Sequence, residues 1–345
     1  MKVLLLLKCC SFCLLLILFN AYSVPTKNNK VEAPCDIYYR YGTPCVAAHS
    51  LVRALYNSYN GPLYLVRRDE DNATKAIHTV SPGGVANSQT QDEFCRHTNK
   101  CTVQRIYDQS PEKNHLDTAP PGEHVPKADK GVNANREKLT LHGQIVYGAY
   151  FEGGMGYRIE KTSGIAVADE PETIYMVTSG RHYNDGCCFD YGNAESDAQD
   201  HGPGTMEAVY WGNNSQWGRG EGSQGPWVMA DLEDGLWSGR ERFNPQKSLN
   251  LNYVMAMVKG NSGGTFALKV GDAKTSNTLQ TVYSGKRPDN YNPMKKQGAI
   301  ILGIGGDNSD QAIGTFYEGV MTKGFSSDQA DHDVHENIVQ AGYGM

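Results

Sequence analysis

Residues 253–270 read YVMAMVKGNSGGTFALKV, in which the apolar runs Tyr253–Val258 and Thr265–Val270 flank a stretch rich in Gly, Asn and Ser. Short apolar runs bounded by such turn residues are typical of β-strands. Similar runs recur along the chain, which contains 38 glycines and 20 tyrosines: Leu63–Val66, Thr102–Tyr107, Gln144–Phe151, Ile174–Thr178, Glu207–Trp211 and Ala299–Ile304. The sequence therefore predicts an all-β fold, an antiparallel sandwich with long, functional loops.

One or two short helices are expected beside these strands. Thr43 reads as the N-cap of a helix that begins at Pro44 and ends before Gly61, with apolar residues at helical spacing between them. A second helix is predicted over Asp331–Ala341. Because no internal repeat, low-complexity tract or Pro/Ser linker divides the chain, residues 35–345 are expected to form one domain.

The N-terminus has the features of a secretory signal peptide over residues 1–23. Lys2 precedes the apolar run Cys9–Phe19, and small residues suited to cleavage follow at 21–23. The run is about half of the roughly 20 residues that a membrane span needs, so an anchor is disfavoured. We expect a secreted protein with a short leader at 24–34 and no membrane partner.

The charge pattern excludes another class of partner. The formal net charge is −6, and loss of residues 1–23 removes two lysines and no acids. The chain lacks the Lys/Arg runs that recognise nucleic-acid backbones, so no nucleic-acid partner is expected.

Six cysteines remain after the signal peptide, an even number that suggests disulfides in an exported chain. Sequence proximity favours the short-loop pairs Cys35–Cys45 and Cys95–Cys101. The adjacent Cys187 and Cys188 either bond to each other in a small ring or remain a free dithiol. Since the cysteines show no paired CxxC spacing and no histidine cluster, no metal and no cofactor is predicted.

Two Asn-X-Ser/Thr sequons begin at Asn72 and Asn213. Both are candidates for N-glycosylation in a secreted protein.

The segment WVMADLEDG, residues 227–235, carries the first candidate acids. Its alternation of apolar and other residues predicts a strand that places Asp231 and Glu233 on one face. Two carboxylates at i and i+2 repel each other, so one tends to hold its proton longer, as acid/base chemistry requires. The alternative is an ordinary solvated strand face.

A second acid follows the strand-like segment GAIILGIGGDNS at residues 298–309. Asp307 comes directly after Gly305 and Gly306, and glycines without a Cβ let a ligand approach the backbone. The alternative is a simple Gly-Asp-Asn turn. Glycosidic cleavage needs two carboxyl groups on either side of one bond, and Glu233 with Asp307 is the candidate pair.

Six segments of the chain together resemble the catalytic domain of glycoside hydrolase family 54, the fungal-type α-L-arabinofuranosidase B. They read CDIYYRYGTPCVAAHSLVRALY, GGVANSQTQDEFC, YDQSPEKNHL, GCCFDYGNAE, GPWVMADLEDGLWSG and YNPMKKQGAIILGIGGDNSDQAIGTFYEGVMTKG. The resemblance runs from about Cys35 to the C-terminus. It implies a concanavalin-like jelly roll and a retaining mechanism, with Glu233 as nucleophile and Asp307 as general acid/base.

The same resemblance implies an arabinose pocket and a substrate. Its lining would include Asp231, Gly306, Trp217 and an adjacent disulfide, Cys187–Cys188. The implied substrate is an arabinose-containing polysaccharide of the plant cell wall, arabinan or arabinoxylan, attacked from its non-reducing ends. The alternatives are a lectin-like module without turnover and a glycosidase acting on galactofuranosides or xylosides.

The sequence departs from the family pattern in two respects. Where relatives read LENGLFSG, this chain reads LEDGLWSG, which places Asp234 and Trp237 after the candidate nucleophile. We expect the Asp234 charge to raise the apparent pKa of Glu233. The arabinose-binding module that usually follows in the family is expected to be absent, because the chain stops at Met345, and a monomer is expected.

Overall fold

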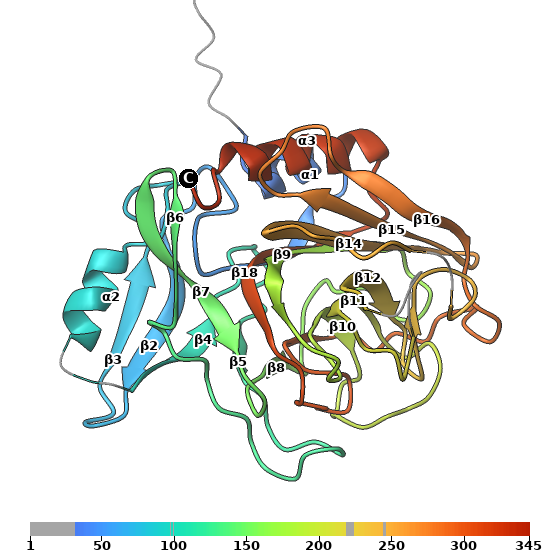
Figure 1. The fold of residues 1–345 in the computed structure, drawn as a ribbon, viewed down its shortest axis with the longest axis horizontal. Helices are drawn as coiled ribbons and strands as arrows, with labels where there is room; N and C mark the ends of the chain where they lie inside the picture. The colour runs from blue at the N-terminus through green and yellow to red at the C-terminus, as the bar shows by residue number, and fades with distance from the viewer. Residues whose placement is uncertain (1–31, 97, 99, 219–223, 244–245) are drawn as a thin grey trace, which may run out of the picture. The chain divides into compact units, whose positions relative to one another are not determined.

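The computed structural model describes residues 32–96, 98, 100–218, 224–243 and 246–345, and the predicted signal peptide lies outside them. Within this part of the chain the strands form two antiparallel sheets (Figure 1). The first sheet has the order β16 (Gln280–Lys286), β15 (Thr265–Asp272), β14 (Tyr253–Asn261), β9 (Glu172–Tyr183), β18 (Gly314–Lys323), β7 (Gln144–Phe151) and β6 (Glu137–Leu141), and β1 (Cys45–Ser50) also pairs with β18.

The second sheet holds the strands that carry the candidate acids. Its order is β13 (Leu236–Trp237), β12 (Trp227–Asp231), β11 (Glu207–Gly212), β10 (Asp190–Ala194), β17 (Ala299–Leu302), β8 (Tyr157–Ile159), β5 (Leu116–Thr118), β4 (Cys101–Ile106), β2 (Pro62–Arg68) and β3 (Thr74–His78). Strands β11 and β12 pack on β9, β14 and β15 of the first sheet. The predicted all-β antiparallel sandwich is confirmed.

Alternate residues of the second sheet face two different environments. On β12, Val228 and Ala230 belong to the main core between the sheets, whereas Trp227 and Met229 pack in a separate cluster with Cys188. Successive side chains of a strand point to opposite faces. Asp231, which continues the Trp227 and Met229 alternation, therefore lies on the face turned away from the first sheet.

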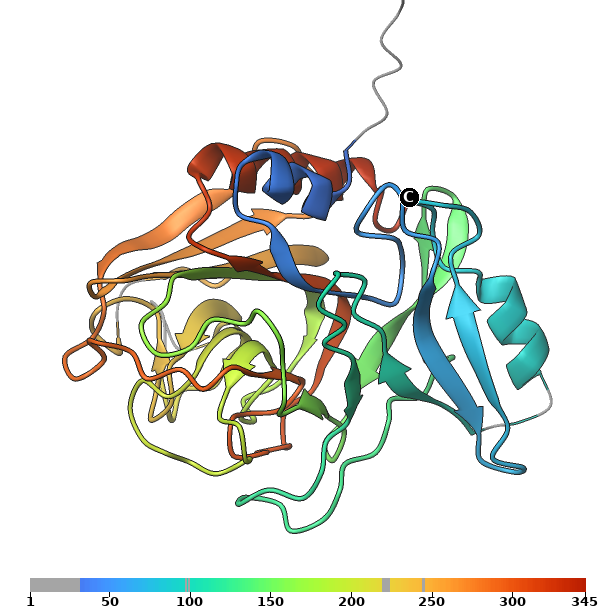
Figure 2. The same ribbon diagram turned by 180° about the vertical axis from the view of Figure 1, so that it is seen from behind.

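The first sheet is covered on its outer face by α1 (Pro34–Arg40) and α3 (Asp328–Gln340), which lie side by side (Figure 2). Asp331 of α3 accepts hydrogen bonds from Lys259 of β14 and Lys269 of β15, each at 2.6 Å. Because both faces of β14 are covered, it reads as a continuous apolar run, whereas the uncovered β16 is largely exposed.

The predicted helix from Pro44 to Gly61 is wrong. Residues Cys45–Ser50 form β1, every one of them buried, and the chain then turns rather than forming a helix. Every residue of β1 is buried, including the polar His49 and Ser50, so its sequence lacks the alternation that would have indicated a strand. The helix that starts with a proline lies ten residues earlier, where Pro34 is the first residue of α1.

The other predicted elements are confirmed. Six of the eight apolar runs named above fall within strands, while Thr102–Tyr107 and Ala299–Ile304 run past β4 and β17, which end at Ile106 and Leu302. The C-terminal helix is α3, which begins at Asp328 after the capping side chain of Ser327. Helix α2 (Ser88–Cys95), capped by Asn87, was missed because its sequence is mostly polar. No helix of the described residues is long and apolar enough to cross a membrane.

The two short-loop disulfides are confirmed. Cys35–Cys45 joins α1 to β1, and Cys95–Cys101 joins the end of α2 to β4. Of the sequon residues, Asn72 is exposed between β2 and β3, whereas Asn213 is partly exposed and its side-chain oxygen is buried. Glycosylation of either stays a prediction.

A buried arginine connects the segment after β1 with β18 and α3. Arg53 donates to Glu318 through Nε at 2.5 Å and Nη2 at 2.7 Å, and to Asn337 Oδ1 at 2.8 Å. Glu318 also accepts from the hydroxyl of Tyr343 at 2.8 Å. The carboxylate of Glu318 is fully buried, so its charge depends on these donors.

We predict that Arg53→Met lowers the free energy of unfolding by about 3–5 kcal/mol, because it leaves a buried carboxylate without its cation. Arg105→Met is the matched control, since Arg105 pairs with Asp117 at 2.6 Å on the surface and should cost less than about 1 kcal/mol. Urea denaturation measures both. Equal losses would contradict the assignment of Arg53.

Candidate active site

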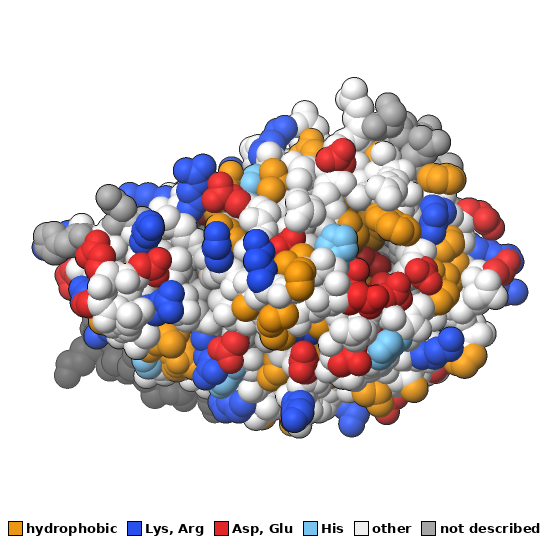
Figure 3. Space-filling view, turned by 90° about the horizontal axis from the view of Figure 1, so that it is seen from below, with side chains coloured by type: hydrophobic (Ala, Val, Ile, Leu, Met, Phe, Trp, Pro, Cys, Tyr) orange, Lys and Arg blue, Asp and Glu red, His pale blue; other side chains and the backbone are white. Residues whose placement is uncertain are grey.

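A cavity of about 390 Å³ opens on the outward face of the second sheet. Asp and Glu side chains gather around a hollow on this face (Figure 3). All of the site residues predicted from the sequence line this cavity: Glu233, Asp307, Asp231, Asp234, Gly306, Trp217, Cys187 and Cys188. They come from four segments that are far apart in the chain.

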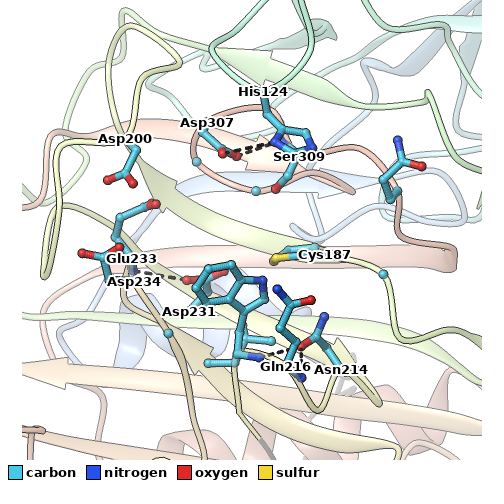
Figure 4. Close-up of a pocket in the computed structure, with 18 of the residues that line it drawn as sticks. His124, Cys187, Asp200, Asn214, Gln216, Asp231, Glu233, Asp234, Asp307 and Ser309 are labelled. Atoms are coloured by element: carbon cyan, nitrogen blue, oxygen red, sulfur yellow. Dashed lines mark hydrogen bonds and ion pairs between the residues drawn. A yellow bond between two sulfur atoms is a disulfide. The ribbon is translucent and has the colours of Figure 1, made fainter.

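Glu233 lies in a turn directly after β12. The strand ends at Asp231, and Glu233 and Asp234 have left-handed φ values of +65° and +54°. The Glu233 N–H donates to Asp231 Oδ1 at 3.2 Å, and the Tyr291 hydroxyl donates to the Glu233 carbonyl at 2.7 Å. The prediction that one strand face presents both acids is therefore wrong for Glu233, although the turn brings both to the cavity (Figure 4).

The carboxyl group of Glu233 is largely removed from water. Burial, with the nearby carboxyls of Glu195, Asp231 and Asp200, raises its pKa to about 11. None of the described groups donates a hydrogen bond to its Oε2 atom. Glu233 is therefore surrounded by acids, a setting in which protons are shared between carboxyl groups.

Asp231 forms such a pair with Asp190 of β10. Burial raises the pKa of Asp190 well above its usual range, and the Asp231 charge adds to this. Burial also raises the pKa of Asp231, to about 7, while the hydrogen bond from Asp190 opposes the rise. Small residues make room for the pair, because Gly192 and Ala208 stand level with Asp231 on the neighbouring strands. The Asp190–Asp231 pair therefore holds a proton more firmly than a solitary carboxyl would.

Asp307 lies in the Gly-Gly-Asp-Asn loop after β17. Its Oδ1 accepts from the Ser309 N–H at 2.8 Å, and its Oδ2 lies 3.9 Å from Nδ1 of His124. The side chain is 26% exposed, so it can exchange protons with solvent. Asn308 follows with φ at +64°, a value that asparagine tolerates well.

Arg158 of β8 holds this loop in place through hydrogen bonds. Its Nη1 donates to the carbonyl of Gly306 at 2.7 Å and to Asn308 Oδ1 at 3.0 Å. Its Nη2 donates to the carbonyl of Glu195. The buried guanidinium thus ties the loop that carries Asp307 to the end of β10.

Gly306 is needed where two carboxyl groups meet the loop. A Cβ at this position would collide with Oε2 of Glu195 and would lie 2.7 Å from Oε2 of Glu233. The sequence predicted a close approach to a glycine backbone at this point. The structure shows that the groups approaching it include two side-chain carboxyls.

The adjacent cysteines form the Cys187–Cys188 disulfide, as the family resemblance implied. Asp231 brings a carboxylate oxygen within 4.8 Å of both sulfurs. Because the sulfurs are bonded to each other, neither is a thiolate that could bind a metal. Trp217, 40% exposed, adds an aromatic side chain to the same cavity.

Sequence reasoning missed several polar residues of the site. His124, Asp200, Asn214 and Gln216 line the cavity from loops whose composition shows no pattern. Glu195 was also missed, although it ends the quoted segment GCCFDYGNAE. No local pattern in that segment distinguishes Glu195, which directly follows the last residue of β10.

Comparison with known proteins identifies the family. Residues 34–344 match the family model described as the catalytic part of alpha-L-arabinofuranosidase B. The chain belongs to this family. It is 51% identical to a probable alpha-L-arabinofuranosidase B of Aspergillus fumigatus over 93% of this chain and 64% of that protein. It is also 51% identical to the alpha-L-arabinofuranosidase B of Aspergillus niger, over 90% of this chain and 63% of that protein.

Solved structures of the same family share the fold. One is a Glu-to-Gln mutant of a GH54 α-L-arabinofuranosidase soaked with 4-nitrophenyl α-L-arabinofuranoside, with a TM-score of 0.87, 48% identity and coverage of 90% of this chain and 66% of that one. Another is an arabinofuranosidase complexed with arabinofuranosyl-α-1,2-xylobiose, with the same score and identity, covering 91% and 66%. The chain spans less than two thirds of the length of these relatives.

We predict that Gly306→Ala displaces the Glu233 carboxyl and lowers kcat/KM for 4-nitrophenyl α-L-arabinofuranoside about 100-fold, because small misplacements of reacting groups are costly. Gly153→Ala is the control, since a Cβ there would meet only the Asp310 carbonyl at an ordinary 3.6 Å. Steady-state kinetics of both folded variants give the two kcat/KM values to compare with that of the wild type. Wild-type kinetics for Gly306→Ala would contradict the crowding described here.

Proposed function

We propose that this family member is a secreted α-L-arabinofuranosidase that releases terminal arabinose from arabinan or arabinoxylan by a retaining double displacement. The observation that supports this most is that Glu233 and Asp307, from separate loops, line one cavity. Two carboxyl groups beside one bond are what glycoside hydrolysis requires. The signal-peptide features and the disulfides support secretion.

The two carboxyls differ in a way that suits two roles. In the proposed cycle Glu233 attacks the anomeric carbon while Asp307 protonates the leaving oxygen, and Asp307 then activates the water that releases arabinose. Glu233 is half-buried and its Oε2 atom is closed to solvent, which suits attack on a sugar that has displaced water. Asp307 is partly exposed and can recover its proton from solvent after each cycle.

The rest of the cavity fits a single terminal sugar. The disulfide Cys187–Cys188 and Trp217 offer apolar surfaces, while Asp231 and Asn214 offer hydrogen-bond partners for hydroxyl groups. A relative bound to arabinofuranosyl-α-1,2-xylobiose supports an arabinose side chain on xylan as the substrate class.

The central test is the loss of turnover in two variants. Glu233→Gln should lower kcat for aryl arabinofuranosides at least about 1,000-fold, since no nucleophile remains. Asp307→Asn should lose less with a good leaving group, and azide should restore its turnover by attacking the glycosyl-enzyme. Proton NMR of the first product should show retained configuration. An inverted product, or sugar binding without turnover by the wild type, would contradict the proposal.

Asp234, which stands where the family pattern has Asn, predicts a modest effect on the pH dependence of activity. Besides burial, the acids that raise the pKa of Glu233 most are Glu195, Asp231 and Asp200. Removing a nearby negative charge lowers a carboxyl pKa, so Asp234→Asn should move the acidic limb of the kcat/KM profile to lower pH, and Asp200→Asn should move it further. Profiles on 4-nitrophenyl α-L-arabinofuranoside measure both shifts. An unchanged acidic limb in Asp234→Asn would show that Asp234 does not raise the pKa of Glu233.

A further inference from the structure

Glu195 is a fully buried glutamate directly after β10. Its Oε1 accepts from the Thr205 hydroxyl at 2.5 Å, and its backbone carbonyl accepts from Arg158. These contacts fix the side chain and leave its second oxygen, Oε2, without a hydrogen-bond donor among the described residues.

The free oxygen of Glu195 lies beside that of Glu233. A Cβ on Gly306 would contact both Oε2 atoms, so the two oxygens approach the same side of one Cα atom. Both are buried, and no described donor satisfies either of them. Two carboxylates this close in a dry site cannot both be ionised, so one proton shared between them is the stable arrangement.

We propose that Glu195 is a positioning residue that accepts the proton of Glu233 and then holds the ionised Glu233 in place by donating it back as a hydrogen bond. The inference rests on the proposed role of Glu233 as nucleophile. The proton moves from Oε2 of Glu233 to Oε2 of Glu195, and no other reactant takes part. The Glu233 carboxylate can then attack, and hydrolysis of the ester restores it while Glu195 keeps the proton.

The environment explains why such a partner is needed. Burial and neighbouring acids favour a protonated Glu233 at neutral pH, and a protonated carboxyl is a poor nucleophile. Asp231 is already hydrogen-bonded to Asp190, so it is not free to take this proton. The charged and titratable groups around the pair are Asp190, Asp231, Asp200, Asp234, Asp307, His124 and Arg158.

None of these groups replaces Glu195. The Arg158 guanidinium donates to backbone carbonyls and to Asn308, rather than to a carboxyl of the pair. Every acid in the group disfavours ionisation of Glu233 through its charge. Glu195 alone combines contact with Glu233 and the capacity to accept its proton.

The test compares two substitutions by their pH profiles on 4-nitrophenyl α-L-arabinofuranoside. In Glu195→Gln the amide can donate to Glu233 Oε2, so we expect kcat within about tenfold of wild type and an acidic limb at the wild-type pH or lower. Glu195→Leu offers no donor, so the acidic limb should move to higher pH by about one unit or more. In this variant kcat at neutral pH should fall about 100-fold with KM nearly unchanged.

Matched controls separate a proton role from a packing role. Glu152→Gln and Glu152→Leu make the same changes at an exposed glutamate outside the cavity and should leave the profile unchanged. If both Glu195 variants lose kcat equally and keep the wild-type acidic limb, Glu195 only fills space and the inference is wrong. Wild-type kinetics in Glu195→Leu would overturn it as well.

Carbon-13 NMR of glutamate carboxyls tests the shared proton without turnover. The wild type should show a protonated glutamate carboxyl at neutral pH that disappears in both Glu195→Gln and Glu233→Gln. This readout decides the inference if Glu195→Leu does not fold, and absence of that resonance would overturn it. If the resonance is present but the wild type cleaves no aryl furanoside, the proposed function fails while the shared proton stands.

Discussion

The carboxyl groups of Asp190, Glu195, Asp231 and Glu233 gather along β10 and around the end of β12, largely withdrawn from water, and no described Lys or Arg donates to their oxygens. Removing a carboxylate from water is costly unless its charge is compensated or it holds a proton. Here the acids compensate one another in two pairs. Their shared protons determine which side chain can react, so the chemistry of the cavity depends on this arrangement.

Another buried acid of the same sheet shows that burial alone does not set the outcome. Burial would raise the pKa of Glu207 on β11, but Lys296 and Arg287 lower it to about 2. Their hydrogen bonds to Glu207 are 3.0 and 2.9 Å long. Glu207 is therefore a fixed charge that links strands and loops. Glu233, in contrast, has acids as neighbours and can change its protonation.

Sequence reasoning succeeded where the signal was local and failed where it depended on tertiary contacts. Apolar runs located the strands because burial on a sheet face selects apolar residues over a few positions. The segment after Pro44 was misread because a strand covered on both sides has no distinctive period. Glu233 and Asp307 were found through motifs, but the left-handed turn at Glu233 was not expected from strand alternation.

Glu195 could not be found from the sequence, since its importance comes from a contact made across the sheet. Asp190 and Glu195 stand at the two ends of β10. Their partners are Asp231, the last residue of β12, and Glu233, two residues beyond it. Because β11 pairs antiparallel with both strands, β10 and β12 run in the same direction. Asp190 can therefore meet Asp231 at the strand end, and Glu195 can meet Glu233 in the turn beyond it. The shared direction of β10 and β12 thus determines which acids form each pair. Arg158 fixes the loop whose Gly306 lies against the Glu195–Glu233 pair.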